Sequence, residues 1–324
     1  MNVTTLLASA IRGCIIAPPG KHFAVADLSN IEGRGAAWLS GEEWKLDAFR
    51  DFDAGTGPDL YILAYAKSLN EDHRYVSKEN RQVGKVQELA LQYGGGANAF
   101  ATFAAAYNID LEHLADKATG AIPEKTIEES KKLLSRMKKR DQVINMSDRA
   151  WVVCDSLKSL WRQAHPAITG YWAALDAAVR QAIAEPDTTV KAGYCKVGFS
   201  GTWLRIRLPS GRYLCYPNAR IDEDNQISYM GVHQYTRKWT RQNSYGPKFL
   251  ENITQAVSCD VLAYGMTLAD QAGFEIVLSV HDELIGEHET FDHRYLADLM
   301  STNPPWASGL PLKAEGFTAS RYRK

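Results

Sequence analysis

The pattern of apolar and polar positions predicts a mixed chain in which helices outnumber strands. Apolar residues recur at a spacing of about 3.6 in several long segments, which is typical of helices with one buried face. We expect helices over residues 42–52, 59–69, 77–93, 126–140, 146–164, 168–184 and 249–272. Turns rich in glycine and proline separate them at 55–58, 94–96 and 303–305.

Two short apolar segments predict strands, at residues 22–27 and 274–280. Each of them places a carboxylate just past its apolar part. A third segment, 203–208, alternates apolar and basic residues and turns at 209–211 into 212–216. This pattern predicts a hairpin with one wet, cationic face that includes Arg212.

Composition narrows the class of protein. The 324 residues are 45% hydrophobic and 23% charged, which is typical of a folded protein of about two domains and excludes a disordered or collagen-like chain. The five cysteines are scattered and never form a C-x-x-C pair, so we expect no disulfide framework and a reducing, cytoplasmic setting. No apolar run reaches the roughly 18 residues of a membrane helix.

The net charge of −1 hides an uneven distribution. Residues 131–163 carry nine basic and three acidic side chains, and residues 191–248 carry ten and three. Both ends are acidic, at −3 for residues 1–60 and −6 for residues 249–324. The distribution indicates a polyanion track beside a carboxylate-rich metal site, and a solvated helix face explains 131–163 equally well.

The first candidate site follows the strand at 22–27. Asp27 lies at the exposed end of this strand, and Glu32 and Arg34 begin a helix beside it. A half-buried aspartate is costly unless it is paired or binds a metal. The alternative is that Asp27 caps the next helix.

The second candidate is the segment 279–283, where His281, Asp282 and Glu283 follow an apolar run. Adjacent acids in an extended chain point to opposite faces, so one of the two can face a metal together with Asp27. Two aspartates at neighbouring strand ends suit Mg²⁺ and two-metal chemistry at phosphorus. A salt-bridged hairpin is the alternative.

The third candidate is a helical stripe of Arg81, Lys85 and Leu89, spaced by four residues. Like charges at this spacing repel, so their placement suggests an anion between them, and a triphosphate is the natural candidate. Tyr93 lies at the helix end, where an aromatic face can test a base pair. Without the other motifs, a solvated helix face remains the simpler interpretation.

Together and in this order, the three segments resemble motifs A, B and C of the family A DNA polymerases, the group of bacterial DNA polymerase I and many bacteriophage replicases. The matching residues are Asp27, Ser29, Ile31, Glu32 and Arg34 for motif A, Arg81, Lys85, Tyr93 and Gly94 for motif B, and residues 280–283 for motif C. Residues 252–260 resemble the helix before motif C, and residues 59–61 resemble a short acidic motif before motif B. The details are most similar to a bacteriophage branch.

The resemblance implies an α+β fold, the polymerase right hand. We expect a palm with an antiparallel sheet and helices over residues 1–40 and 245–324. Mainly helical fingers, with the motif B helix and a basic insertion, are expected over residues 41–244. Only 26 residues precede Asp27, so we expect the thumb and the exonuclease domain to be absent from these residues.

The resemblance also implies metal-binding and catalytic residues. Asp27 and Asp282 would bind two Mg²⁺ ions, joined by the backbone carbonyl of Leu28. Glu283, counted among the catalytic residues, and His281 would support the primer end, and His281 would contact DNA.

For the nucleotide, the resemblance implies that Arg81 and Lys85 grip the triphosphate and that Lys85 also takes part in catalysis. Glu32 would exclude a ribose 2′-OH, and Tyr93 would pack at the templating position. The family usually has an aromatic residue where this chain has Leu89, so discrimination against sugar analogues is the property in doubt.

Further residues are expected to contact DNA. Gln255 occupies the place of a glutamine that contacts the minor groove, and Arg34 belongs to motif A. The basic insertion interleaves cations with aromatic residues, as a backbone-binding and base-stacking surface does. Its candidate DNA-binding residues are Arg205, Arg207, Arg237, Lys238 and Arg241, and a solvated insertion is the alternative.

The function implied is that of a DNA polymerase core that extends a primer on template DNA with dNTPs, in replication or repair. The alternative is a truncated or split-gene fragment that binds DNA, or a separate polypeptide bearing the thumb or exonuclease, without activity of its own. A two-metal nuclease is less favoured, because it has no use for Glu32, Arg81, Lys85 and Tyr93 in these roles.

Overall fold

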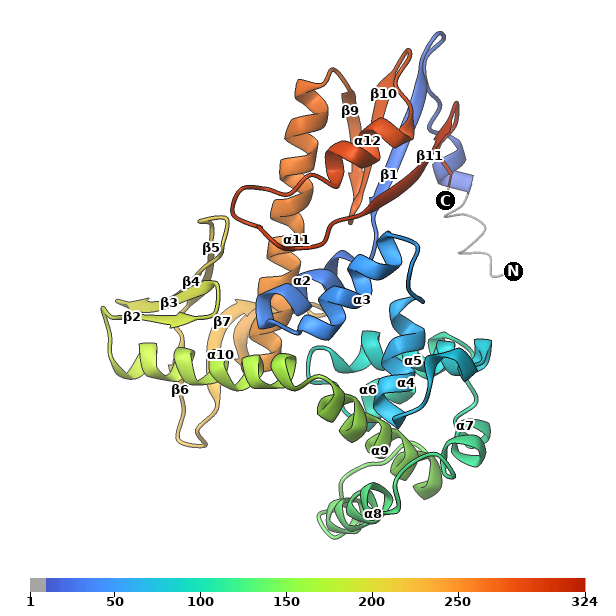
Figure 1. The fold of residues 1–324 in the computed structure, drawn as a ribbon. Helices are drawn as coiled ribbons and strands as arrows, with labels where there is room; N and C mark the ends of the chain where they lie inside the picture. Colours follow the sequence, from blue (N-terminus) through green and yellow to red (C-terminus); the bar gives the residue numbers. More distant parts are fainter. Residues whose placement is uncertain (1–9, 324) are drawn as a thin grey trace. The chain divides into compact units, whose positions relative to one another are not determined.

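The computed structural model describes residues 10–323, which form two compact units (Figure 1). Unit 1 comprises the residues up to 35, 208–212 and those from 253 onward, and unit 2 comprises 36–207 and 213–252. The divisions between these units fall inside two continuous helices, α2 (Ile31–Ser40) and α11 (Gly246–Gln271), whose ends belong to different units.

Unit 1 is built on a four-stranded antiparallel sheet in the order β11–β1–β10–β9. Helix α12 packs against β1 and β11 (Figure 1). The bounds are β1 (His22–Leu28), β9 (Glu275–Val280), β10 (Glu283–His288), β11 (Ala314–Ala319) and α12 (His293–Met300).

Strand β1 forms the centre of this sheet because its sequence has no polar side chain between His22 and Asp27. Phe23 and Val25 pack with Ile285 and Tyr322 in a buried cluster. The alanines between them are completely buried as well. A strand buried on both faces reads as a continuous apolar run, and its polar residues fall at its ends.

Unit 2 is mainly helical, and helix α9 packs against most of the other helices. Its apolar residues recur around much of the helix, and most of its side chains are buried. The helices of unit 2 are α3 (Glu43–Asp53), α4 (Leu60–Leu69), α5 (Lys78–Leu91), α6 (Ala97–Ala106), α7 (Leu111–Ala118), α8 (Glu124–Lys138), α9 (Asp148–Ala164) and α10 (Pro166–Ala184), with a short 3₁₀ helix, η1 (His73–Tyr75).

Two antiparallel sheets complete unit 2, one in the order β2–β3–β4–β5 and one in the order β6–β7–β8. Helix α10 packs against β2 and β3. The strands are β2 (Thr189–Ala192), β3 (Cys195–Ser200), β4 (Trp203–Arg207), β5 (Tyr213–Pro217), β6 (Arg220–Ile221), β7 (Ile227–Val232) and β8 (Trp239–Ser244).

A buried polar cluster joins α5 to α3 and α9. Lys45 is completely buried, pairs with the carboxylate of Glu88 and donates to Gln92 Oε1 at 3.0 Å. Trp161 Nε1 donates to Glu88 Oε1 at 2.8 Å, and His165 Nε2 lies 3.1 Å from the same oxygen. Burial alone raises the pKa of Glu88, but Lys45 and His165 outweigh it and hold the pKa below its usual range.

The long periodic segments were predicted well. All seven expected helices are present, with ends within about three residues of those expected. Local capping explains this accuracy: Asp59 accepts from the amide of Ile62 at the start of α4, and Ser77 accepts from the amide of Asn80 at the start of α5. The strands expected at 22–27, 203–208, 212–216 and 274–280 are also confirmed.

The sequence analysis missed the strands β2, β3, β6, β7, β8, β10 and β11 and the helices α6, α7 and α12. The helix α6 is rich in alanine and has little polar contrast between its faces. The missed strands are short, and several carry polar or charged residues on the face turned to solvent. Such strands depend on their neighbours more than on their own apolar pattern.

Two expectations about the whole chain can be compared with residues 10–323. All five cysteines are free thiols, which confirms that no disulfide framework is present. None of the helices described combines the length and the apolar character that crossing a bilayer requires.

We predict that Glu88→Gln strongly destabilises unit 2. Glutamine keeps an acceptor for Trp161 but leaves the ammonium of Lys45 buried without its counter-charge, at a cost of about 3–5 kcal/mol. Urea unfolding followed by circular dichroism measures the loss. Because folding lowers the pKa of Glu88, its contribution is present above the ordinary value of 4.5 and shrinks as pH falls below it.

The control is Glu128→Gln, which removes an exposed carboxylate 2.8 Å from Lys131. It is expected to leave the unfolding midpoint unchanged. Equal midpoints for the two variants would contradict a structural role for the buried cluster.

Candidate active site

The end of strand β1 meets the turn between β9 and β10 in unit 1. Strands β1 and β10 pair antiparallel, and the register sets Asp27 opposite Glu283. The amide of Leu28 donates to the carbonyl oxygen of Asp282 at 3.0 Å. The fold therefore brings together the two carboxylate-bearing segments that lie near opposite ends of the sequence.

His281 and Asp282 form the two-residue turn of the β9–β10 hairpin, between the paired residues Val280 and Glu283. His281 has a φ of +58°, a left-handed conformation that is uncommon for a residue other than glycine. Two-residue hairpins use such conformations because they match the twist of the flanking strands. The turn leaves His281 exposed and Asp282 half-buried beside the end of β1.

An open hollow of about 550 Å³ lies on unit 1 next to this turn. Its lining residues are Ile31 and Glu32 from α2, Gln255, Ser258 and Cys259 from α11, and His281 and Asp282 from the turn. The sequence analysis did not identify Ser258 and Cys259. They follow Gln255 by three and four positions, so helical spacing alone places them on the same face of α11.

Glu283 is buried next to this hollow and is not among the residues that line it. Its side chain is only 2% exposed, and the hydroxyl of Tyr322 donates to Glu283 Oε1. Burial, together with this hydrogen bond, raises the pKa of Tyr322 to about 12. Glu283 thus positions the strand beside Asp27 and does not face the hollow.

Arg34 is also buried. Its side chain is 1% exposed, its Nε donates to the carbonyl oxygen of Ser29 at 2.7 Å, and its Nη1 donates to that of Pro311 at 3.4 Å. A charged group this deeply buried needs such partners. Arg34 therefore fixes the turn after Asp27 from inside unit 1.

Helix α5 carries the predicted stripe in unit 2. Arg81 and Lys85 are partly exposed and Leu89 is exposed, whereas most residues between Lys85 and the end of the helix are buried. The guanidinium of Arg81 pairs with the carboxylate of Asp59 and lies 5.3 Å from the ring centroid of Tyr61. Asp59 and Tyr61 belong to the short acidic motif that the sequence analysis singled out.

Lys85 lies between two aromatic rings. Its Nζ is 4.5 Å from the ring centroid of Tyr107 and 5.9 Å from that of Tyr61. Burial raises the pKa of Tyr61 to about 12, so this hydroxyl stays neutral. The two rings stabilise the ammonium by cation–π attraction and leave it without a carboxylate partner among the described residues.

Tyr93 lies just beyond the end of α5 and is half-buried. The chain turns sharply after it, with a φ of +80° at Gly94. A Cβ atom on Gly95 would approach a carbonyl oxygen of the last turn of α5 to 1.8 Å, and Arg162 donates to the carbonyl oxygens of Gly94 and Gly95 at 3.3 and 3.2 Å. Only glycine fits this turn, which sets the position of Tyr93.

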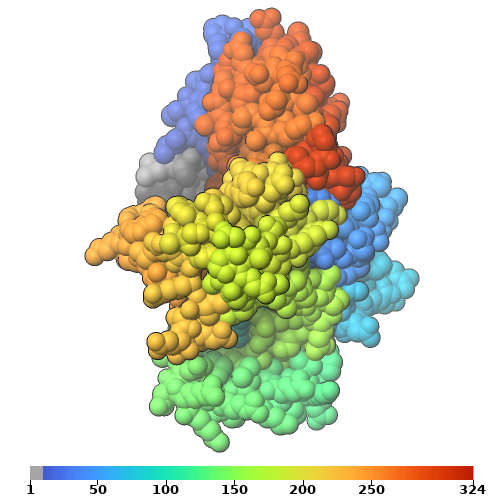
Figure 2. Space-filling view, turned by 90° about the vertical axis from the view of Figure 1, so that its left-hand side faces the viewer, coloured from blue at the N-terminus to red at the C-terminus, as the bar shows by residue number. Residues whose placement is uncertain are grey.

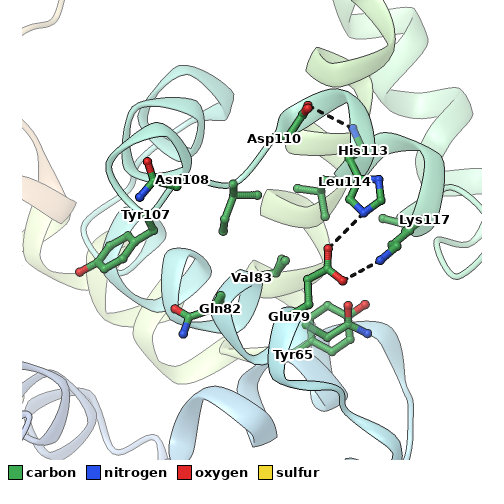
Figure 3. Close-up of a pocket in the computed structure, with 13 residues that line it drawn as sticks. Tyr65, Glu79, Gln82, Val83, Tyr107, Asn108, Asp110, His113, Leu114 and Lys117 are labelled. Carbon is green, nitrogen blue, oxygen red and sulfur yellow. Dashed lines mark hydrogen bonds and ion pairs between the residues drawn. The ribbon is translucent and has the colours of Figure 1, made fainter.

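A pocket of about 250 Å³ lies between α5, α6 and α7 (Figure 3). Glu79 reaches across it to α7, 2.6 Å from Lys117 Nζ and 3.2 Å from His113 Nε2. The hydrogen bond from Lys117 lowers the pKa of Glu79. Tyr107, which also contacts Lys85, lines the same pocket. The ion pairs of Glu79 link α7 to α5, the helix that carries the motif B residues.

The candidate DNA-binding cations of the insertion lie in two places. Arg205 and Arg207 are exposed on β4, and Arg237 and Lys238 are exposed in the loop between β7 and β8. Arg241 is half-buried, and its Nη1 donates to the carbonyl oxygen of Asn218 and to Ser228 Oγ, both at 3.1 Å. These bonds attach Arg241 to β7 and to the segment that precedes β6.

The expectation that Arg212 joins the cationic face is corrected. Its Nε donates to Asp260 Oδ1 at 2.7 Å, and its Nη2 donates to the carbonyl oxygen of Ala256 at 2.9 Å. Ser210 Oγ donates to the other oxygen of Asp260 at 2.6 Å. The turn at 208–212 is thereby attached to α11 within unit 1.

The donor set at the end of β1 fits a hard divalent cation. No group of three histidine, cysteine or acidic side chains converges anywhere in residues 10–323, so the chain by itself forms no closed metal cage. Mg²⁺ is usually held by one or two carboxylates and completes its shell with water and substrate phosphates. Asp27, Asp282 and the backbone at Leu28 supply that kind of open, oxygen-only site.

The fold of the chain is that of a DNA polymerase domain. A solved structure described as the POL domain of Pol1 from M. smegmatis in complex with DNA primer-template and dNTP covers 99% of this chain with a TM-score of 0.56 at 16% sequence identity. The chain covers 43% of that structure. No protein-family model matches the sequence.

Sequence relatives point to the same class. The DNA polymerase of Bacillus phage SP02 is 32% identical over the whole chain, which covers 44% of that protein. The DNA polymerase of Mycobacterium phage D29 is 31% identical over 45% of this chain and 23% of its own length, and DNA polymerase I of Aquifex aeolicus is 32% identical over 29% and 16%. The chain is therefore similar in sequence to phage and bacterial DNA polymerases, and it spans less than half of the length of each of these relatives.

We predict that Tyr322→Phe destabilises unit 1. The change removes the hydroxyl that donates to the buried carboxylate of Glu283, and an unsatisfied buried acceptor costs about 1–3 kcal/mol. Thermal and urea unfolding measure the loss. The matched control is Tyr235→Phe, because Tyr235 is 86% exposed, and an equal effect of both changes would contradict the positioning role of Tyr322.

Proposed function

We propose that this chain is the catalytic core of a template-directed DNA polymerase that adds deoxynucleotides to a primer 3′ end during replication or repair, in the cytoplasm. The observation that carries the proposal is the pairing of β1 with β10, which sets Asp27 beside the turn that bears Asp282. Unit 1 is the palm in this proposal, and unit 2 is the fingers.

Asp27, Asp282 and the backbone carbonyl of Leu28 hold two Mg²⁺ ions in the proposed active site. When bound, the ions neutralise the charge that develops on the phosphates. The chain contributes a rigid frame for them, because Asp27 follows a completely buried strand and Asp282 lies in a two-residue turn hydrogen-bonded to that strand.

Arg81 and Lys85 bind the triphosphate of the incoming nucleotide. The guanidinium of Arg81, paired with Asp59 in the structure, exchanges this carboxylate for phosphate oxygens. Lys85, held between two rings, carries a free ammonium group that can donate a proton to the pyrophosphate leaving group. Phosphoryl transfer depends mainly on this kind of positioning and charge stabilisation.

The hollow in unit 1 accommodates the primer end and the sugar of the nucleotide. Glu32 occupies the space that a ribose 2′-OH needs, Gln255 contacts the minor groove, and His281 contacts the primer. In unit 2, Tyr93 packs at the templating position, and Leu89 stands beside the sugar in place of the aromatic ring that the motif B pattern usually has. Exposed cations of the insertion, Arg205, Arg207, Arg237 and Lys238, contact the DNA backbone.

A second candidate is a fragment that binds DNA without turnover of its own. The observation behind it is that the chain spans 44% of the SP02 relative. A separate polypeptide with a thumb or exonuclease is then the partner that completes the enzyme. The first experiment below separates the two candidates.

We predict Mg²⁺-dependent extension of a labelled primer on a DNA template by the purified chain. Asp27→Asn and Asp282→Asn are each expected to lower the extension rate by about 10²-fold or more, because loss of metal-borne charge stabilisation costs several kcal/mol. Asp47→Asn, at an exposed aspartate paired with Arg50, is the matched control and keeps the wild-type rate.

Extension that persists in both variants would overturn the proposed active site. If the wild-type chain is inactive alone but active after addition of the remaining part of a relative such as the SP02 enzyme, the fragment is favoured. If neither mixture extends a primer, the polymerase proposal fails.

We predict that Glu32→Ala relaxes sugar selection. Removing the carboxylate from the hollow opens space for a 2′-OH, so the ratio of ribonucleotide to deoxynucleotide incorporation rises by about 10-fold or more, equivalent to about 1.4 kcal/mol in the barrier. Single-nucleotide insertion kinetics with each sugar measure the ratio. Glu43→Ala changes an exposed glutamate in the first turn of α3 and serves as the control; an unchanged ratio in Glu32→Ala would exclude the steric role.

A further inference from the structure

The solvent face of the β2–β5 sheet carries a row of like charges. The strand registers set Lys191 opposite Lys196, Lys196 opposite Arg207, and Arg207 opposite Tyr213. All four side chains are exposed. One line across the four strands therefore consists of three cations and a tyrosine, and Arg205 lies two residues from Arg207 on the same face of β4.

Repulsion between the like charges of this row destabilises the sheet. Residues directly opposite each other in an antiparallel pair have Cβ atoms only about 5 Å apart, and like charges at that distance repel. Within residues 10–323, Lys191, Lys196, Arg205 and Arg207 form no ion pair with a carboxylate. Folding of the sheet gains nothing from these charges, so a role outside folding is the simplest explanation for them.

The other basic segment, 131–163, behaves differently. Lys131, Lys138, Arg149 and Lys158 each pair with a carboxylate. Four of the nine basic side chains of this segment are thus balanced by a nearby carboxylate. None of the four cations on the β2–β5 sheet has such a partner among the described residues.

The cationic row borders an open hollow of about 520 Å³. Gly198 lies opposite Arg205 and is one of the residues that line this hollow. Asp187 is the one carboxylate in the lining, and its Oδ1 accepts from Ser200 Oγ at 2.6 Å. Figure 2 shows residues 189–217, drawn in yellow-green to yellow, uncovered on this face of the molecule.

Aromatic side chains flank the cations. Trp203 is 40% exposed, and the guanidinium of Arg205 lies 5.9 Å from its ring centroid. Tyr213 is 52% exposed at the end of the cationic row. A cationic groove that tracks phosphates, with exposed rings on which bases stack, is the usual construction of a surface for single-stranded nucleic acid.

We propose that the β2–β5 sheet is a second nucleic-acid site that binds a single strand, with Lys191, Lys196, Arg205 and Arg207 on its phosphates and Trp203 and Tyr213 on its bases. The inference deepens the proposed polymerase function and rests on it for the class of ligand. Its surface lies wholly within unit 2 and uses none of the residues around the hollow of unit 1.

The test measures binding of a fluorescein-labelled 20-nucleotide oligo(dT) and of a 20-base-pair duplex to the 324-residue chain, by anisotropy, without metal or dNTP. Lys196→Gln/Arg207→Gln is expected to weaken oligo(dT) binding about 10-fold or more at low salt and to reduce the slope of log K against log[salt] by about 1.4, two contacts at about 0.7 each. Trp203→Ala weakens binding without changing the slope, because stacking releases no counterions.

The control is Lys132→Gln/Lys139→Gln, which removes the same charge from an exposed position of α8 and from the exposed residue that caps its C-terminal end. It keeps wild-type affinity and slope. The melting temperature of Lys196→Gln/Arg207→Gln stays equal to that of wild type or rises, because repulsion across the sheet is relieved. If this variant matches the control in affinity and slope, or loses as much affinity for the duplex as for oligo(dT), the single-strand site is refuted.

The result of the oligo(dT) binding test is independent of the result of the primer-extension test. Loss of oligo(dT) binding in Lys196→Gln/Arg207→Gln, in a chain that never extends a primer, supports the single-strand site and refutes the polymerase proposal. Normal primer extension together with unchanged oligo(dT) binding in that variant refutes the single-strand site alone.

Discussion

The buried ion pair between Lys45 and Glu88 is the constraint on which the arrangement of unit 2 depends. Two charges removed from water are costly, and they persist only where other polar groups complete their hydrogen bonds. These groups come from the end of α5, which supplies Gln92, and from the end of α9, which supplies Trp161 and His165. Because Glu88 lies about one turn after Lys85, the same cluster that closes the core also sets the position of the stripe of Arg81, Lys85 and Leu89 on α5. Stability and site geometry therefore share one set of contacts.

In unit 1, backbone hydrogen bonds between paired strands hold the charged side chains in place. Asp27 and Asp282 are acceptable near the surface because each follows a segment whose backbone is fully satisfied: a buried central strand in one case and a tight hairpin in the other. Behind them, Glu283 and Arg34 are charged but buried, and each is held by partners inside the unit. Residues adjacent in a motif thus divide into those that face the hollow and those that support it.

The net charge of −1 conceals a functional division of charge. Four of the cations on α8 and α9 pair with nearby carboxylates, whereas the β2–β5 sheet aligns cations that repel one another. Composition alone treats these two segments as equivalent. Cross-strand register separates them, because it decides which side chains lie within reach of each other.

The sequence by itself determined the long helices, the central strand β1 and the local motifs, since periodicity and caps such as Asp59 and Ser77 act between residues a few positions apart. It also pointed to Asp27, Glu32, Arg81, Lys85 and Asp282. Tertiary structure decided what depends on distant partners: the sheet order, the short strands β2 and β3, the burial of Glu283 and Arg34, and the binding of Arg212 to Asp260. It also created the row of Lys191, Lys196 and Arg207, because strand pairing joins residues whose proximity no local pattern encodes.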